Sequence, residues 1–291
     1  MKQMSLQGRS VLGLSDFSES EIERILEMAG QMKSILSSGH KKTDLLRGKS
    51  VVNLFSEAST RTRSSFELAG KYLGADVINI TKSGSSMTKG ESMRDTLLTL
   101  SAMGTDAIVI RDSSEGAAFF AKQTSSPWVK VPVVLNAGDG AHAHPSQALL
   151  DLFTVRQAGK KIRGMKYVIL GDILHSRVAR SDIVGFTALG AEVHLCGPRT
   201  LVPRELESMG AVVDSSLEEA LQGAGAVNVL RIQLERAAGG FFPTLREYSR
   251  LFGLTEERLA LADKDAVVLH PGPMNRGDRD FFTIQPTTDS P

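Results

Sequence analysis

Hydroxyl side chains and an arginine stand at the point where a buried strand is predicted to give way to a helix. Residues 51–55 form an apolar run typical of a parallel strand, and apolar residues recur at helical spacing from Phe66 to Gly74. Residues 59–62 therefore fall at the helix N-terminus, where backbone N–H groups lack intrahelical partners and the helix dipole is positive. Such a place binds anions, phosphate above all, and Arg61 adds a charged donor. The competing interpretation is a plain helix cap followed by a solvated basic turn.

Further donors follow two later strands. Arg111 comes directly after the predicted strand 107–110, and ligands of open α/β sheets bind at the carboxyl ends of strands. His144 precedes Pro145, which suits the first position of a helix, and Gln147 lies in the first turn of that helix. A neutral His144 is suited to donate to a carbonyl oxygen, and a capping role is the alternative.

Metal and thiol chemistry have weaker support. His142 and His144 are spaced as two metal ligands could be, but no third ligand stands at a plausible spacing, so no metal site is predicted. Cys196 is the only cysteine and ends a predicted strand, which favours a place in the core over a role as nucleophile. The sequence has no G-x-S-x-G nucleophile motif either.

Two polar stretches are predicted to be mobile. Residues 81–89 are rich in serine and glycine and end at Lys89, so this loop could close over an anion. A plain surface loop is the alternative. Residues 233–250 form a long stretch with little periodicity, which favours a second mobile segment.

Strands and helices alternate along the chain in two series, the second of which begins after the basic turn 159–164. The predicted strands lie at 51–55, 75–80, 107–110, 131–136, 167–172, 192–195, 226–230 and 266–269. This alternation predicts an α/β fold with two doubly wound parallel-sheet domains, residues 1–144 and 145–291, and an active site in the cleft between them.

Composition limits the classes of function. The 291 residues are 41% hydrophobic and 23% charged, as in a soluble globular protein of two domains. A net charge of +1 gives no field that would recruit nucleic acid or an anionic membrane. No apolar run is long enough to span a bilayer, and no signal peptide opens the chain. A single cysteine allows no intrachain disulfide, so a cytoplasmic location is expected.

Motifs in unbroken order give the chain a resemblance to a known family. The sequence reads Ser-Thr-Arg-Thr-Arg at 59–63, His-Pro-Ser-Gln at 144–147 and His-Pro-Gly-Pro at 270–273, and together these runs resemble the carbamoyltransferase family. An Arg-x-Gln pair at 231–233 and the run Pro-Met-Asn-Arg-Gly at 273–277 make the chain similar to the members that act on aspartate. Ornithine-type relatives carry a cysteine-containing motif in place of His-Pro-Gly-Pro.

The resemblance implies transfer of the carbamoyl group of carbamoyl phosphate to the amino group of L-aspartate, an early step of de novo pyrimidine biosynthesis. The amine would attack the carbonyl carbon, a tetrahedral oxyanion would form, and phosphate would leave. One fixed donor at the developing charge is typically worth about 3 kcal/mol. The departing phosphate is the expected base for the amine proton, and no cofactor is implied.

The resemblance also implies a role for each matching residue. Those expected to act in catalysis are Arg61, Thr62, Arg111, His144 and Lys89. The phosphate would be held by Ser59, Thr60, Arg61 and Thr62, the carbonyl oxygen by Thr62, Arg111 and His144, and the amide nitrogen by Gln147. The aspartate carboxylates would be held by Arg177, Arg231 and Gln233 with help from Lys89, and the carbamoyl pocket would be completed by the carbonyls of Gly272 and Pro273.

The family's active site also lies at a subunit interface. The resemblance implies a homotrimer with shared active sites, in which Ser85 and Lys89 reach into the site of the neighbouring subunit. A regulatory chain or a dihydroorotase as a further partner is left open, and no nucleic acid or membrane partner is expected.

The chain departs from the family after Gly277. Residues 278–291 have no helical periodicity, whereas relatives continue into an amphipathic helix that returns to the first domain. Without that helix, lower stability or activity than in relatives is expected. Two other functions stay open: a carbamoyltransferase for another amine, ornithine-like, and a non-catalytic chain of the same fold.

Overall fold

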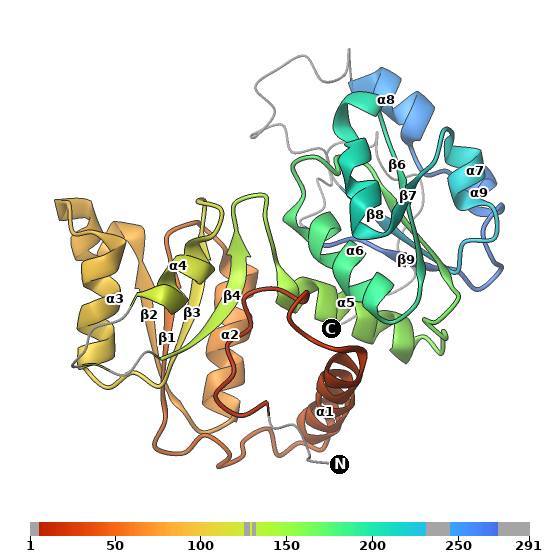
Figure 1. The fold of residues 1–291 in the computed structure, drawn as a ribbon. Coiled ribbons are helices and arrows are strands. Elements are labelled where there is room, and N and C mark those ends of the chain that lie inside the picture. The colour runs from red at the N-terminus through yellow and green to blue at the C-terminus, as the bar shows by residue number, and fades with distance from the viewer. Residues whose placement is uncertain (1–5, 125–128, 130–131, 231–244, 273–291) are drawn as a thin grey trace. The chain divides into compact units, whose positions relative to one another are not determined.

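The chain divides into two compact units. They comprise Met1–Ser146 and Gln147–Pro291. The structure is a computed structural model that describes residues 6–124, 129, 132–230 and 245–272 (Figure 1). The predicted boundary after residue 144 and this division both fall at the start of one helix, α5, Pro145–Gln157.

The first unit is built on a four-stranded parallel sheet. Its strands are β1 Ser50–Phe55, β2 Asp76–Thr81, β3 Ala107–Asp112 and β4 Val133–Asp139, in the order β2-β1-β3-β4. The chain runs from β1 outward to β2 and then returns to the other side of β1 as β3. The strand order therefore reverses between β1 and β3, and such a switch point opens a crevice at the carboxyl ends of the two strands.

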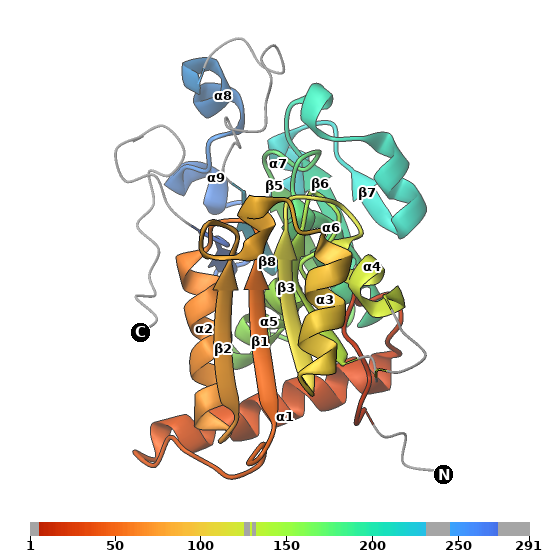
Figure 2. The ribbon, with the colours of Figure 1, turned by 90° about the vertical axis from the view of Figure 1, so that its left-hand side faces the viewer.

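Alternation along the strands places helices on both faces of this sheet. Val52, Leu54 and Ile108 pack with α3 Met93–Ala102 and α4 Ala117–Gln123. The intervening side chains of β1 and β3 face the opposite way, toward α2 Thr60–Tyr72. Figures 1 and 2 show the course of these helices beside the sheet. An earlier helix, α1 Glu19–Ser37, starts at a capping box made by Ser18 and Glu21.

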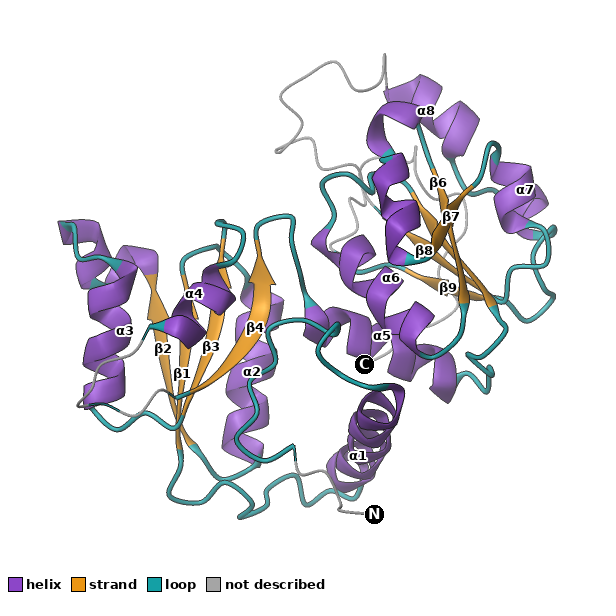
Figure 3. Cartoon of the chain, in the orientation of Figure 1, coloured by secondary structure: helices purple, strands orange, loops and turns teal. Residues whose placement is uncertain are grey.

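The second unit repeats the plan with five parallel strands. They are β5 Lys166–Leu170, β6 Glu192–Cys196, β7 Ala211–Val213, β8 Ala226–Val229 and β9 Val267–Leu269, in the order β7-β6-β5-β8-β9 (Figure 3). The order reverses between β5 and β8, so the loops after these strands flank the second crevice of this kind. Two doubly wound parallel sheets, as predicted, are confirmed.

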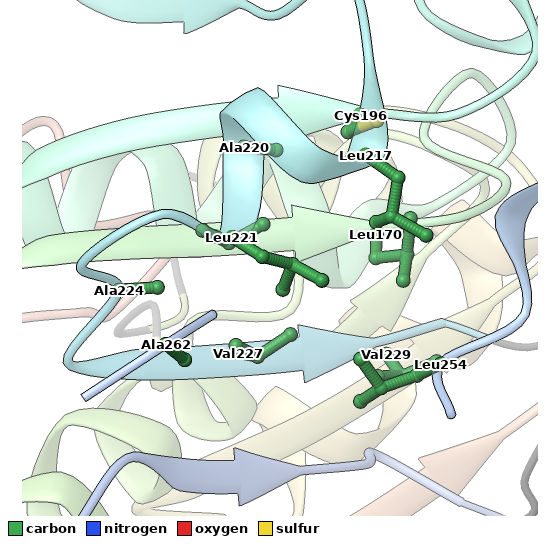
Figure 4. Close-up of a cluster of buried hydrophobic side chains, with 11 residues drawn as sticks. Leu170, Cys196, Leu217, Ala220, Leu221, Ala224, Val227, Val229, Leu254 and Ala262 are labelled. Atoms are coloured by element: carbon green, nitrogen blue, oxygen red, sulfur yellow. The ribbon is translucent and has the colours of Figure 1, made fainter. Parts of the chain in front are cut away.

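Helices cover both faces of the second sheet. Besides α5, they are α6 Arg177–Ala188, α7 Leu217–Leu221, α8 Leu245–Phe252 and α9 Glu256–Leu259. On one face, Leu170 and Val227 pack against Leu217 and Leu221 of α7 (Figure 4). Tyr167 of β5 stacks on Phe186 of α6, with ring centroids 3.6 Å apart.

Cys196 lies inside this core, as the sequence predicted. Its side chain packs beside Leu217, and only 2% of the residue is exposed (Figure 4). Burial, helped by the charge of Asp214, raises the pKa of the Cys196 thiol to about 12. The thiol is therefore protonated at neutral pH and shielded from reagents.

We therefore expect Cys196 to be inert in the native protein. Its reaction with a thiol reagent such as DTNB at pH 8 should be at least about 100-fold slower than in the guanidinium-unfolded chain, because the thiolate is scarce and enclosed. The measurement is the release of the coloured thiolate over time. A native rate close to the unfolded one would contradict this place in the core.

The structure adds local detail that the sequence did not predict. The stretch 81–89, predicted to be a mobile loop, contains two short 3₁₀ helices, Lys82–Gly84 and Ser86–Lys89. The carboxyl end of the stretch 233–250 is the helix α8, and residues 231–244 lie outside the described residues. The tail 278–291 lies outside them too. Neither α4 nor β7 was predicted, because seven and three residues are too short for a clear periodicity.

Candidate functional site

The first turn of α2 has the backbone geometry of an anion-binding helix N-terminus. Ser59 is the N-cap residue in extended conformation, but its side chain makes no capping hydrogen bond. The first intrahelical bond runs from the Arg63 N–H to the Ser59 carbonyl, at 3.3 Å. The N–H groups of Thr60, Arg61 and Thr62 precede it, in the part of a helix where backbone donors have no intrahelical acceptor. The geometry favours an anion site over a plain serine cap.

Arg111 links the ends of three strands. It is the penultimate residue of β3, in register with Phe55 of β1, and its carbonyl accepts the Ser56 N–H at 2.9 Å. Its guanidinium Nη1 donates to Thr62 Oγ1 at 3.4 Å and to the Ala137 carbonyl at 3.1 Å. The sheet thus brings together groups from β1, β3 and β4, and the predicted neighbours Thr62 and Arg111 do meet.

His144 completes this cluster from the end of the loop after β4. It is 7% exposed, and its Nε2 lies 3.4 Å from Arg111 Nη1. Because a guanidinium only donates, Nε2 accepts here and the hydrogen sits on Nδ1, which lies 3.3 Å from Ser146 Oγ. To donate to a carbonyl oxygen, His144 would have to carry its hydrogen on Nε2 instead.

Glu57 is a member of this cluster that the sequence did not single out. Its Oε1 accepts from Arg111 Nη2 at 3.0 Å, and both side chains are largely buried. The carboxylate offsets the charge of Arg111 and fixes the plane of the guanidinium. The only sequence signal was its place between β1 and the α2 cap.

A buried carboxylate shapes the loop that carries His144. Asp139, 1% exposed, accepts from the backbone N–H groups of Gly116 at 2.8 Å and Ala143 at 3.1 Å. It also accepts from Asn136 Nδ2 at 2.9 Å and lies 3.0 Å from His142 Nδ1. His142 therefore contacts Asp139 through Nδ1, and its sequence spacing from His144 reflects loop structure.

Gln147 has its own partner in the second unit. Its Nε2 donates to Oδ1 of Asp151, one helical turn later, at 3.0 Å. Asn228 Nδ2 lies 3.5 Å from the other oxygen of Asp151 and 2.8 Å from Oδ2 of Asp182. Tyr167 donates its hydroxyl hydrogen to the same Asp182 oxygen at 2.9 Å. We call Asp151, Asp182, Tyr167 and Asn228 the buried polar cluster; each is at most 5% exposed.

The two carboxyl groups of the buried polar cluster are hard to ionise. Burial, together with the charge of Asp182, raises the pKa of Asp151 well above its ordinary value. Burial raises the pKa of Asp182 to about 7, against the lowering effect of the hydrogen bonds from Tyr167 and Asn228. Asp182 has the better set of donors, so the proton of the pair resides on Asp151.

The raised pKa of Asp182 makes stability depend on pH. The folded state holds a proton that the unfolded chain has already lost above about pH 5, so stability falls as pH rises through about 7. Between pH 5.5 and 8 Asp182 alone should account for a loss on the order of 2 kcal/mol, and the proton kept by Asp151 adds to this loss. A double variant Asp151→Asn/Asp182→Asn has no carboxyl group here and serves as the reference. Urea unfolding at both pH values checks this, and equal pH dependence in the two proteins would contradict it.

The structure describes some of the residues predicted to hold the aspartate and the carbamoyl group. Arg177 is the first residue of α6, after β5 has ended at Leu170, and is 6% exposed. Gly272 is half-buried with φ +63°, while Arg231, Gln233 and Pro273 lie outside the described residues.

Ser85 and Lys89 stand on the 3₁₀ turns after the edge strand β2. Lys89 is exposed and Ser85 is half-buried, with its hydroxyl donating to the Lys82 carbonyl at 3.1 Å. Within the described part of the chain, no hydrogen bond is recorded from either residue to Thr62, Arg111 or His144.

The described residues contain neither a cluster of metal ligands nor a helix able to span a membrane. In residues 6–124, 129, 132–230 and 245–272, no three His, Cys, Asp or Glu side chains come together as a metal site would require. Over the same residues no helix has the length and apolarity needed to cross a membrane.

Comparison with protein families assigns both halves of the chain. Residues 9–157 match the carbamoyl-phosphate-binding domain of aspartate/ornithine carbamoyltransferases, and residues 163–281 match the aspartate/ornithine-binding domain. The chain is 57% identical to the aspartate carbamoyltransferase catalytic subunit of Pelotomaculum thermopropionicum, over 94% of this chain and 87% of that protein. The corresponding subunit of Heliobacterium modesticaldum is 54% identical over 97% and 91%.

Solved structures agree. Aspartate transcarbamoylase from Trypanosoma cruzi in complex with N-(phosphonacetyl)-L-aspartic acid superposes with a TM-score of 0.81 at 29% identity, covering 95% of this chain and 87% of that one. Ornithine carbamoyltransferase from Pyrococcus furiosus superposes with a TM-score of 0.80 at 27% identity, covering 94% and 88%. With both family models matched in order along the chain and relatives above half identity, the chain belongs to the aspartate/ornithine carbamoyltransferase family.

Proposed function

We propose that this chain transfers the carbamoyl group of carbamoyl phosphate to the amino group of L-aspartate, giving N-carbamoyl-L-aspartate and phosphate. The observation that carries the proposal is the meeting of Thr62, Arg111 and His144 at the carboxyl ends of β1, β3 and β4. Relatives named as catalytic subunits of aspartate carbamoyltransferase, at 52–57% identity, support it.

The chemistry needs donors rather than a protein nucleophile. The aspartate nitrogen forms a bond to the carbonyl carbon, the bond from that carbon to the phosphate oxygen breaks, and the amine proton leaves with the phosphate. Arg111 and Thr62 are close enough to act on one carbonyl oxygen as it gains charge. His144 joins them once its hydrogen is on Nε2.

The phosphate would lie at the start of α2. The N–H groups of residues 60–62, the hydroxyls of Ser59 and Thr60 and the guanidinium of Arg61 supply a cationic and hydrogen-bonding cradle for a leaving dianion. Arg61 is exposed, so it has room to swing onto the anion. A phosphate bound there would stand beside Arg111, which lies at the carboxyl end of the neighbouring strand β3.

Aspartate would be gripped by arginines at the second crevice. Arg177, buried at the start of α6, follows β5, and Arg231 and Gln233 follow β8 in the sequence. These are the two strands between which the strand order reverses. Guanidinium groups hold carboxylates in bidentate fashion, which suits a substrate with two of them.

Ornithine is the second candidate amine, because the solved ornithine enzyme is as similar in fold as the aspartate enzyme. The assay that separates them uses the purified chain with carbamoyl phosphate and either L-aspartate or L-ornithine. Carbamoyl aspartate as the main product is expected. If ornithine is carbamoylated instead, ornithine is the substrate of this chain. If neither amine gives a product, the chain is non-catalytic.

A homotrimer with shared sites is part of the proposal. Ser85 and Lys89 lie next to the edge strand β2, whose Ile78 is 54% exposed, and Leu68 on the adjoining helix α2 is 47% exposed. Exposed apolar groups beside an open sheet edge favour association there. Lys89 of one subunit would then complete the site of the next.

Shared sites can be tested by mixing inactive variants. Lys89→Ala and Arg111→Met should each be nearly inactive, but refolded together they should regain activity, because some sites in mixed trimers receive both intact residues. No recovery in particles of trimer mass would rule out sharing. Light scattering measures the mass of the complex purified from the cell extract. A mass above that of the trimer would show that a regulatory chain or a dihydroorotase accompanies it.

The proposed reaction belongs to de novo pyrimidine biosynthesis in the cytoplasm. The buried, protonated thiol of Cys196 is compatible with that compartment, since it takes no part in a disulfide.

A further inference from the structure

A chain of hydrogen bonds runs from Gln147 into the buried polar cluster. Gln147 Nε2 donates to Oδ1 of Asp151 at 3.0 Å, and Asn228 Nδ2 lies 3.5 Å from the other oxygen of Asp151 and 2.8 Å from Oδ2 of Asp182. Asp182 also accepts from Tyr167 at 2.9 Å. The cluster draws on α5, α6, β5 and β8, so the whole second sheet supports one end of the Gln147 side chain.

The position of the proton on Asp151 follows from the partners of this carboxyl group. Burial, together with the charge of Asp182, raises the pKa of Asp151 well above its ordinary value, so Asp151 keeps a proton. Asp151 Oδ1 already accepts from Gln147, so the proton belongs on Oδ2, which lies on the side of Asn228 and Asp182. Oδ1 is thereby kept as an acceptor only.

This arrangement fixes which end of the Gln147 amide is free. A side-chain amide has a donating NH₂ and an accepting oxygen, and the two ends exchange by a flip that changes no shape. Because Asp151 Oδ1 only accepts, the NH₂ must face it, and the oxygen Oε1 faces the other way. A carbamoyl group presents NH₂ hydrogens, which need an acceptor of this kind.

We propose that Asp151 is a positioning residue that holds Gln147 with its oxygen toward the substrate and so selects a carbamoyl over an acetyl phosphate. The inference rests on the proposed function. It extends that function from the residues that touch substrate to a buried carboxyl group that does not.

The test compares two replacements of Asp151. Asp151→Leu removes the acceptor that faces the Gln147 NH₂, so either end of the Gln147 amide can turn toward the substrate. Asp151→Asn keeps an acceptor oxygen toward Gln147, because its NH₂ group faces the Asp182 carboxyl group, so Gln147 keeps its orientation. Both variants remove one buried carboxyl group, and the second is therefore the control for general damage.

The readout is the ratio of kcat/KM for carbamoyl phosphate to that for acetyl phosphate, which has a methyl group in place of NH₂. Asp151→Leu should lower this ratio at least about fivefold, the effect of losing one oriented hydrogen bond. Asp151→Asn should leave it within about twofold of the wild-type ratio. Should Asp151→Leu not fold, Asp151→Ala removes the same acceptor with a smaller side chain, and the same drop is expected.

The outcomes are distinguishable. If the wild-type chain forms carbamoyl aspartate but the ratio is the same in folded Asp151→Leu, the positioning role is wrong and the proposed function stands. Equal loss of the ratio in both variants would also overturn the role, since it would indicate structural damage. If the wild-type chain forms no carbamoyl aspartate, the proposed function fails and this inference with it.

Discussion

Replacing Arg111 with methionine should lower kcat by about 10²–10³, the loss seen when one donor is removed from a developing oxyanion. Arg111 has the largest share of contacts in the site: it touches Thr62, Ala137, Glu57 and His144. Methionine keeps much of the length of the side chain but donates nothing. Steady-state kinetics with carbamoyl phosphate and L-aspartate measures the effect.

The control for Arg111→Met is the same exchange at Arg47, an exposed residue before β1 and thus at the opposite end of the sheet. Its kcat should stay within about twofold of wild type, because surface charges of this kind contribute little. An Arg111→Met enzyme that keeps more than a third of the wild-type kcat would contradict the central place of this residue.

Replacing Asp139 with asparagine should cost about 3 kcal/mol of unfolding free energy, because buried donors lose a charged acceptor and meet an NH₂ group instead. The donors concerned are the N–H groups of Gly116 and Ala143 and the side chain of Asn136. Since Ala143 adjoins His144, the folded variant should also lose about tenfold or more in kcat through misplacement of His144.

Urea unfolding and kinetics on the folded variant measure the two effects separately. Asp76→Asn is the matched exchange at an exposed position of β2 and should change stability by less than about 0.5 kcal/mol. If Asp139→Asn unfolds at the same urea concentration as Asp76→Asn, the carboxylate does not organise the loop as described.

Local patterns were sufficient for most of the fold. The apolar run of β1 and the proline that opens α5 are signals within a few residues, and the elements they predicted are present. Alternation of strands and helices then fixed the parallel sheets, since parallel strands need helical crossovers. Helix α8 was missed because it follows a long stretch with little periodicity.

Sequence order also anticipated part of the site. Arg111 was expected at a strand end, and its contact with Thr62 follows from β1 and β3 being neighbours, although the two residues are 49 positions apart. Arg177 was predicted from the family resemblance alone, and the structure places it as the first residue of α6, seven positions after the last residue of β5.

The carboxyl groups behind the site could not be found from sequence. Asp139, Asp151 and Asp182 read as surface residues of loops or helices, because a charged side chain is rarely buried. Their burial depends on partners such as Asn228, which is 77 positions from Asp151. Only the packed structure shows that Asp139 holds the loop before His144 and that Asp151 accepts from Gln147.

A crystal structure with N-(phosphonacetyl)-L-aspartic acid, the ligand of one solved relative, tests the central claim most directly. The phosphonate oxygens should lie within hydrogen-bond distance of the N–H groups at the start of α2 and of Arg61, with Arg111 at the carbonyl oxygen, and the carboxylates should meet Arg177 and Arg231. A phosphonate bound away from α2 and Arg111, or carboxylates that touch neither arginine of the second unit, would contradict the account.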